Sequence, residues 1–281
     1  MEENLKIINE IAQTSNHQQY LDRMDNSFQV SSKKFILDFI KGKNILDVGC
    51  GSGVLIRKLI SHDSSLNIVG IDLNEKSVDF CTNQGLNVKQ ASIDDFYFDE
   101  CQFDTIIFSS VLHEFSSYAP EKARFTILPI VTALKAAYRL LKPGGRIIIR
   151  DGIKGSNDEI SLLARSNDEV CAFNRYMKDT PISFESNYNI SGLVMTSTEK
   201  LLKEFLFTYT WGEESYSREI NEQYGILTID EWKNVVKFCR FKINNMLISS
   251  EEYAKYLSTH FYESELDNIF EQSTILLVAT K

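Results

Sequence analysis

Three closely spaced glycines with two acidic neighbours carry the clearest chemical signal in this sequence. Gly49, Gly51 and Gly53 stand between an apolar run and a stretch with helical spacing. Glycines allow positive φ and let a ligand approach the backbone, and the amides of a following helix favour a polar or anionic group. Asp47 precedes the loop, and Asp72 ends the next apolar run, where a carboxylate can accept from both hydroxyls of a ribose. The pattern predicts a site for a cofactor that contains a nucleoside, and these residues alone fit either a dinucleotide or a smaller adenosyl cofactor.

Residues able to move a proton follow two later apolar runs. His113 and Glu114 come just after residues 103–109, and Asp151 follows residues 146–150 directly. Because the carboxyl ends of parallel strands share one edge of a sheet, we expect these side chains to face the glycine loop. His113 is the first candidate for a general base, since the pKa of histidine ordinarily lies near neutrality. Asp151 is the second, and the alternative is that these residues only pack or cap.

Aromatic side chains are concentrated in residues 173–224, at a density well above the 11% of the whole chain. They form either an apolar pocket that excludes water from an acceptor or the ordinary core of a helical cap. His260, in a later insertion, could reach the site as part of such a cap. The run 211–225 mixes acids with rings; it could bind a cationic acceptor through cation–π contacts, but a solvated loop is the expectation. The ten rings are Phe173, Tyr176, Phe184, Tyr188, Phe205, Phe207, Tyr209, Trp211, Tyr216 and Tyr224.

The spacing of apolar residues predicts the elements that must hold these side chains. Short apolar runs alternate with stretches of helical period, as in a parallel sheet covered by helices on both faces. The expected strands are residues 44–48, 67–72, 86–89, 103–109, 146–150, 241–248 and 274–280. The expected helices are residues 31–41, 54–62, 75–84, 120–142, 199–207, 228–239 and 251–270, with a break or kink at Pro129.

Composition narrows the class of protein. The 281 residues are 43% hydrophobic and 25% charged, the balance of a folded globular chain rather than a disordered one. A net charge of −9 argues against a main role in binding nucleic-acid phosphates. The five cysteines have no metal-binding spacing, so we expect no metal site. With no membrane-spanning run and no signal-like start, a reducing, cytoplasmic location is the expectation.

Four segments, taken together, resemble those of the class I S-adenosylmethionine-dependent methyltransferases in order and separation. The resemblance implies an α/β fold, with a Rossmann-like, mostly parallel seven-stranded sheet in three layers and an antiparallel last strand. It covers about residues 30–151 closely and 229–280 loosely. The segments are ILDVGCGSG (45–53), VGIDLNEKSV (69–78), FDTIIFSSVLHEF (103–115) and LLKPGGRIIIRD (140–151).

The same resemblance implies how the chain is divided. An N-terminal helical segment, residues 1–30, would precede one methyltransferase domain over residues 31–281. Insertions at about 153–228 and 249–273 interrupt the strand and helix alternation. We expect these insertions to be helical and to cap the active site.

The resemblance also assigns residues to the cofactor S-adenosyl-L-methionine. The glycine loop would hold its methionine half, Asp72 the ribose, and Leu73 would lie beside the adenine. At the end of the third strand the family commonly has an acid that contacts adenine. Ser92 and Ile93 stand there in this chain, and Asp94 is the alternative acceptor.

Two further groups complete the implied cofactor site. Ser109 and Ser110, at the end of the fourth strand, would pass close to the sulfonium. Tyr20 and Arg23 would reach the cofactor carboxylate from the segment before the first strand. The full set is Asp47, Gly49, Cys50, Gly51, Gly53, Asp72, Leu73, Ser92, Ile93, Ser109, Ser110 and Arg23.

The resemblance implies methyl transfer by in-line displacement, for which the protein must hold the acceptor and the methyl group in line. A neutral amine needs no general base, whereas an alcohol or phenol does. We expect a small-molecule acceptor that bears oxygen or nitrogen. The alternatives are a protein or tRNA acceptor, or a non-catalytic partner that binds the cofactor to activate another methyltransferase. The oligomeric state is left open, a homodimer included.

Overall fold

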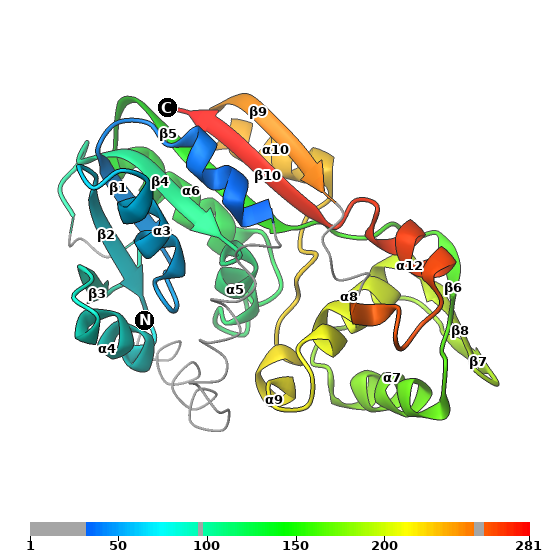
Figure 1. Cartoon of the computed structure of the whole chain (residues 1–281). Coiled ribbons are helices and arrows are strands. Elements are labelled where there is room, and N and C mark those ends of the chain that lie inside the picture. The colour runs from blue at the N-terminus through cyan, green and yellow to red at the C-terminus, as the bar shows by residue number, and fades with distance from the viewer. Residues whose placement is uncertain (1–31, 95–97, 250–255) are drawn as a thin grey trace.

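A computed structural model describes residues 32–94, 98–249 and 256–281. The helical segment expected over residues 1–30 lies outside them. The chain forms a large sheet with its helices and, beside it, a smaller part that we call the cap (Figure 1). The cap consists of residues 159–224 and 256–270, so two separate segments of the chain build it.

Seven strands form the main sheet, in the order β3-β2-β1-β4-β5-β10-β9. β1 pairs in parallel with β2 and β4, and β4 pairs in parallel with β5. β10 lies antiparallel between β5 and β9, which confirms the predicted fold class and its antiparallel last strand. The strands are β1 (Asn44–Val48), β2 (Asn67–Asp72), β3 (Val88–Gln90), β4 (Phe103–Ser109), β5 (Leu141–Gly152), β9 (Lys242–Ser249) and β10 (Thr274–Thr280).

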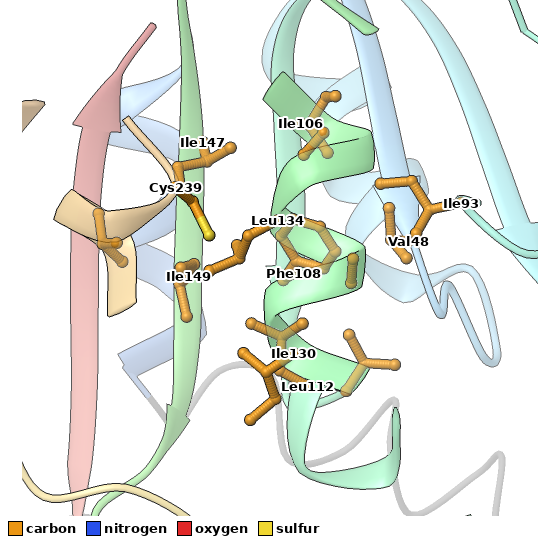
Figure 2. Close-up of a cluster of buried hydrophobic side chains, with 14 of the residues drawn as sticks. Val48, Ile93, Ile106, Phe108, Leu112, Ile130, Leu134, Ile147, Ile149 and Cys239 are labelled. Carbon is orange, nitrogen blue, oxygen red and sulfur yellow. The ribbon is translucent and has the colours of Figure 1, made fainter. Parts of the chain in front are cut away.

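Helices cover both faces of this sheet and give the predicted three layers. Successive strand residues point to opposite faces, so Ile106 and Phe108 of β4 pack beneath α6, whereas Ile107 packs on the side of α3. Ile130 and Leu134 of α6 lie against the first face (Figure 2). The elements are the 3-10 helix η1 (Ser32–Phe39) and the α-helices α3 (Val54–His62), α4 (Glu75–Asn83), α5 (Leu112–Ser117), α6 (Leu128–Leu140) and α10 (Ile229–Phe238).

Three predicted helices differ from the structure. Of the stretch 251–270, the described residues form the α-helix Glu263–Phe270, and residues 258–262 are not helical. Residues 31–41 form a 3-10 helix over Ser32–Phe39 rather than an α-helix. The stretch 120–142 becomes helical only at Leu128, so Pro129 lies in the first turn of α6, where its missing N–H costs nothing and no kink follows. Across the three described segments, no helix combines the length and apolar composition needed to cross a membrane.

The cap contains a second sheet, whereas only helices were predicted there. Its strands are antiparallel in the order β6-β8-β7. β6 and β8 pair across about 30 intervening residues, so no local hairpin pattern marks them in the sequence. The cap elements are β6 (Glu159–Leu163), α7 (Asn167–Asp179), β7 (Asn189–Ser191), β8 (Val194–Thr198), α8 (Glu199–Thr210), α9 (Tyr216–Glu219) and α12 (Glu263–Phe270).

Most rings of residues 173–224 form a hydrophobic core inside the cap. Phe205 packs edge-on against Phe173 and Tyr176, with ring centroids 5.1 and 5.6 Å away. Phe261, from the second cap segment, joins the same cluster with its centroid 6.2 Å from that of Phe205. Most of these rings therefore serve as core, while Tyr176, Phe205, Tyr209 and Tyr216 also line a pocket in the cap.

Candidate active site

The glycine loop between β1 and α3 needs its glycines for backbone reasons. Gly49, Gly51 and Gly53 have φ of 67°, 52° and 73°, in the left-handed region that other residues disfavour. A β-carbon on Gly49 would stand 2.3 Å from Cγ2 of Val111, and one on Gly53 would stand 2.5 Å from Cδ1 of Leu86. Both distances are closer than any real contact, so a larger residue would force the neighbouring side chain or the loop itself to move.

Asp72 is held beside this loop by backbone amides. Its Oδ2 atom accepts from the amide of Gly51 at 2.8 Å, and its Oδ1 atom accepts from the amide of Asn74 at 2.8 Å. The amide of Cys50 donates to the carbonyl of Ile71 at 3.0 Å, which ties the loop to β2. Burial raises the pKa of Asp72, while its bonds to the two amides act in the opposite direction. The two amides thus fix the carboxylate beside the glycine loop.

Asp47 presents a buried carboxylate with an unused oxygen. Its side chain is 2% exposed, and its Oδ2 atom has no hydrogen-bond partner within the described segments. Burial raises the pKa of Asp47 to about 7, against a smaller lowering effect of Lys33. Buried polar atoms are normally paired, so a cationic donor on a ligand would complete this group. Together with the loop and Asp72, it fits a ligand that carries a ribose and an amino group, as S-adenosylmethionine does.

The residues predicted to lie near adenine follow β2 and β3. The carbonyl of Leu73 accepts from Nε2 of Gln90 at 3.0 Å. Ser92 donates its hydroxyl to a carboxylate oxygen of Asp94, so the two alternative acceptors form one hydrogen-bonded pair. Ile93 is fully buried in the core of the main sheet. Its side chain therefore packs into the core and does not reach the surface where a ligand would lie.

The end of β4 carries a residue in an uncommon conformation. Ser109 ends the strand, and Ser110 has a φ of 58° although it is not glycine. The amide of Ser110 donates to the carbonyl of Arg150 at 2.7 Å, and the guanidinium of Arg150 donates to the Ser110 hydroxyl. Arg150 is 5% exposed and also donates to Oγ of Ser32 at 3.1 Å. Such conformations cluster at functional sites, and the supporting role of Arg150 was not predicted.

His113 lies buried between two carboxylates. Its Nδ1 atom is 2.7 Å from Oδ1 of Asp151, and its Nε2 atom is 3.4 Å from Oε2 of Glu222. The ring stacks on Tyr224, with centroids 4.8 Å apart. Burial alone would lower the pKa of His113, but the carboxylates of Asp151 and Glu222 together raise it well above its usual value. Each ring nitrogen therefore faces a carboxylate.

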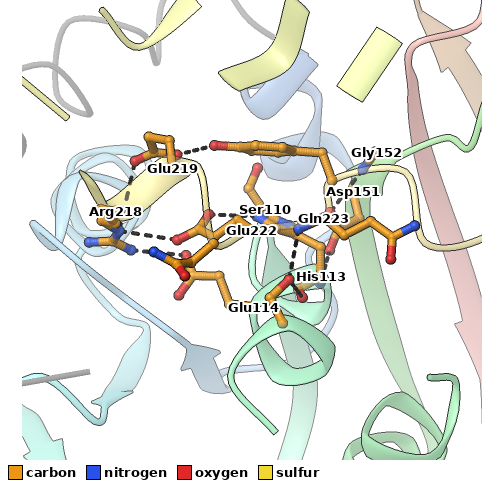
Figure 3. Close-up of polar contacts among 12 residues, drawn as sticks. Ser110, His113, Glu114, Asp151, Gly152, Arg218, Glu219, Glu222 and Gln223 are labelled. Atoms are coloured by element: carbon orange, nitrogen blue, oxygen red, sulfur yellow. Dashed lines mark hydrogen bonds and ion pairs between the residues drawn. The ribbon is translucent and has the colours of Figure 1, made fainter. Parts of the chain in front are cut away.

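Arg218 of the cap supplies a second positive charge. Its Nε atom is 3.2 Å from Oε1 of Glu222, and its Nη2 atom is 3.3 Å from Oε1 of Glu114. The Tyr118 hydroxyl donates to Oε1 of Glu222 at 2.5 Å. Oε1 of Glu219 lies 3.8 Å from Nε of Arg218 and has no hydrogen-bond partner in the described chain. Figure 3 shows that these contacts join the cap to the segments after β4 and β5.

The acids of this cluster differ in their affinity for protons. Burial and the negative charge of Glu222 raise the pKa of Glu114 to about 7 and that of Glu219 to about 8. Despite its own burial, Glu222 has a pKa lowered to about 2 by Arg218 and His113. The cluster holds four acidic side chains, of which Asp151, Glu219 and Glu222 are buried and Glu114 is partly exposed.

Two expectations about the insertions were wrong. The run 211–225 is not a solvated loop, because Glu219 and Glu222 are 1% and 3% exposed. His260 does not reach the glycine loop; its Nδ1 atom lies 3.0 Å from the Tyr209 hydroxyl and 2.9 Å from Oε1 of Glu169, both in the cap. No local pattern marks the burial of this run, because the ionic partners of Glu222 include a histidine more than 100 positions earlier. Tyr20 and Arg23, assigned to the cofactor carboxylate, lie outside the described residues.

Comparison with known proteins agrees with this geometry. The family model described as "Methyltransferase domain" matches residues 40–238. The chain is 30% identical over 159 residues to a tRNA N(3)-methylcytidine methyltransferase of Schizosaccharomyces pombe, covering 51% of this chain and 48% of that protein. It is 26% identical over 167 residues to a fatty-acid O-methyltransferase of Mycolicibacterium smegmatis, covering 58% and 52%. The chain thus spans about half the length of these curated relatives.

Solved structures show the same fold. An S-adenosylmethionine-dependent methyltransferase of Mesorhizobium loti aligns with a TM-score of 0.53 and 15% identity, over 90% of this chain and 100% of that one. A second, from Archaeoglobus fulgidus, aligns with a TM-score of 0.51 and 13% identity, over 93% and 94%. Because the family model covers most of the chain and the glycine loop, Asp47 and Asp72 fit the cofactor, this protein belongs to the methyltransferase-domain family, among the S-adenosylmethionine-dependent class I methyltransferases.

Proposed function

We propose that this protein transfers the methyl group of S-adenosylmethionine to an oxygen or nitrogen atom of a small-molecule acceptor, by in-line displacement. The residues that follow β4 and β5 are buried beneath the cap, and this burial supports a small-molecule acceptor. His113 and Asp151 are 4% and 2% exposed, and Glu222 of the cap is paired with His113. A macromolecular surface would have to displace the cap to reach this place, whereas a small molecule needs only a limited opening.

The family resemblance and the geometry together support a set of residues that would hold the cofactor. Asp47 would pair with its ammonium group, Asp72 would accept from the ribose hydroxyls, and Leu73 and Ser92 would flank the adenine. When bound, the cofactor supplies a methyl group that its sulfonium makes easy to displace. The contribution of the chain is to bind, to align and to exclude water, which together can lower the barrier by several kcal/mol.

The proton-acceptor role of His113 stays a prediction, and the arrangement supports a different one. Asp151 occupies one ring nitrogen and Glu222 faces the other, so the ring has no free nitrogen to receive a proton from an acceptor. We propose that His113 and Asp151 are positioning residues that fix Glu222 and thereby hold the cap closed over the reacting groups.

The matched relatives act on different acceptors, so they support methyl transfer without naming one. A tRNA acceptor is the second candidate, because the relative at 30% identity is a tRNA methyltransferase. The charges weigh against it. Residues 173–224 hold five basic and eight acidic side chains, and the chain carries a net charge of −9. Binding of nucleic acid rests mainly on neutralising phosphates, which such a surface does poorly.

Labelled methyl transfer tests the proposal. The protein is incubated with methyl-labelled cofactor and, in separate reactions, with pooled small amines, phenols and carboxylic acids, with total tRNA, and with denatured protein. We expect label in a small-molecule pool only. Label confined to tRNA or protein would contradict the small-molecule acceptor, and the same assay at about 150 mM salt excludes purely electrostatic retention.

A substitution at Asp72 checks the cofactor site. Asp72→Asn should weaken the affinity for S-adenosylhomocysteine by about 10- to 100-fold in calorimetry, because charge-assisted bonds to the ribose contribute about 1–3 kcal/mol. Asp79→Asn is the control, since Asp79 is an exposed acid on the neighbouring helix α4. Equal affinities of the two variants would show that Asp72 does not contact the ligand.

A further inference from the structure

We propose that His113, Glu114 and Glu222 form a binding site for a divalent cation. Each residue offers one ligand atom, and the three atoms lie within 4.8 Å of one another. One imidazole nitrogen and two carboxylate oxygens suit Zn²⁺ or Mn²⁺. Three protein ligands leave a coordination position open, as in sites that bind a substrate oxygen. The site goes beyond the methyl transfer proposed above, and its existence does not depend on it.

The spacing of two ligands fits such an ion. Nε2 of His113 and Oε2 of Glu222 are 3.4 Å apart, which is about the edge of a tetrahedron with metal–ligand bonds of about 2.1 Å. On the far side of the ring, Asp151 lies 2.7 Å from Nδ1. Metal-binding histidines usually donate this second nitrogen to a carboxylate, which fixes the ring and its tautomer. Asp151 therefore orients His113 as a ligand through Nε2.

The charges of the cluster also favour a cation. Asp151, Glu114, Glu219 and Glu222 are four acids, and Arg218 is the one permanently charged base paired with them among the described residues. Buried carboxylates are costly unless they are paired or bind a metal. A divalent ion at Nε2 of His113 would balance the negative charge of these acids.

Arg218 now pairs with two of the ligands, and the structure offers it another partner. Its Nε atom lies 3.2 Å from Glu222 and 3.8 Å from Oε1 of Glu219. That Glu219 oxygen is buried and has no hydrogen-bond partner in the described part of the chain. A shift of the guanidinium toward Glu219 would satisfy this oxygen and free Glu114 and Glu222 to bind the ion. Arg218 and the metal are therefore competitors for the same carboxylates.

This competition gives the proposal a distinctive test. The protein is freed of metal with a chelator and titrated with Mn²⁺ alone, followed by electron paramagnetic resonance, and with Zn²⁺ alone in calorimetry. We expect one ion per chain. Glu222→Gln should weaken binding at least about tenfold, whereas Arg218→Gln should strengthen it several-fold, because the competing cation is gone.

Matched variants separate this site from adventitious binding. Glu213→Gln removes an exposed cap acid that pairs with Arg175, and it should leave the metal affinity unchanged. If Glu222→Gln does not fold, Glu114→Gln replaces it, because Glu114 is a partly exposed metal ligand. This variant should also bind the metal at least about tenfold more weakly. Failure of the unmodified protein to bind either ion with one-to-one stoichiometry would overturn the proposal. So would weaker binding in Arg218→Gln. Methyl transfer that persists without metal would leave the proposed function standing while the metal site is judged by binding alone.

Discussion

Replacement of Gly49 by alanine should abolish cofactor binding and destabilise the fold. The residue has a φ of 67°, and its new β-carbon would stand 2.3 Å from Cγ2 of Val111. A left-handed conformation costs a non-glycine residue about 1–2 kcal/mol, and overpacking costs about 1–3 kcal/mol more. Urea unfolding should show a loss of about 2–5 kcal/mol, and S-adenosylhomocysteine affinity should fall at least about 100-fold because the loop must move.

Gly85→Ala is the matched control for this prediction. Gly85 also has a positive φ, of 76°, but a β-carbon there would meet nothing within 4 Å. It should lose only the backbone term, about 1–2 kcal/mol, and bind the ligand normally. If the two variants lost equal stability and both kept the ligand, the close approach of Val111 would have no consequence and the loop would be freer than its geometry indicates.

Asp47→Asn should stabilise the protein at alkaline pH while weakening the cofactor. The pKa of Asp47 is raised by burial from 3.8 to about 7, so the folded state keeps a proton that the unfolded chain releases. Between pH 4 and 7 the free energy of unfolding therefore falls as pH rises, by on the order of 4 kcal/mol for a shift of about three units. Asparagine removes this loss, because it carries no charge.

Unfolding measured across pH checks the sign. The variant and the unmodified protein should be equally stable near pH 4, and the variant should be the more stable near pH 8. Asp79→Asn, at an exposed acid, should follow the unmodified protein throughout. A variant less stable at pH 8 would mean that a partner stabilises the carboxylate. Weaker binding of S-adenosylhomocysteine by Asp47→Asn would show that the Asp47 carboxylate contributes to ligand binding although it lowers the stability of the fold.

The glycine loop and the strands around it could be predicted because their signals are local. β1, β2 and β4 are short apolar runs next to turn residues, and the loop glycines stand at fixed spacing from Asp72. The last strand was placed correctly for a different reason, since its antiparallel direction came from the family resemblance. Local pattern and family pattern agreed there, and β10 confirms both.

The acidic cluster could not be predicted, because its members are far apart in the sequence. His113 and Glu222 are more than 100 residues apart, and nothing in the composition of 211–225 separates a buried ionic segment from an exposed one. A charged side chain is expected to be exposed unless an ionic partner allows its burial, and the sequence does not show that partner. The pairing of β6 with β8 escaped prediction for the same reason, as it joins segments about 30 residues apart without a hairpin turn between them.

The place of β10 constrains the order in which the chain assembles. This strand lies between β5 and β9, although both precede it in synthesis. β9 therefore has no neighbour to pair with until residues 274–280 arrive, and α12, which completes the cap core, is made only just before them. Contacts between distant segments are slow to form because the entropy of closing the loop comes first. The edge of the sheet and the cap are thus completed together, late in folding, and until then β5 presents an unpaired edge on which another chain could pair.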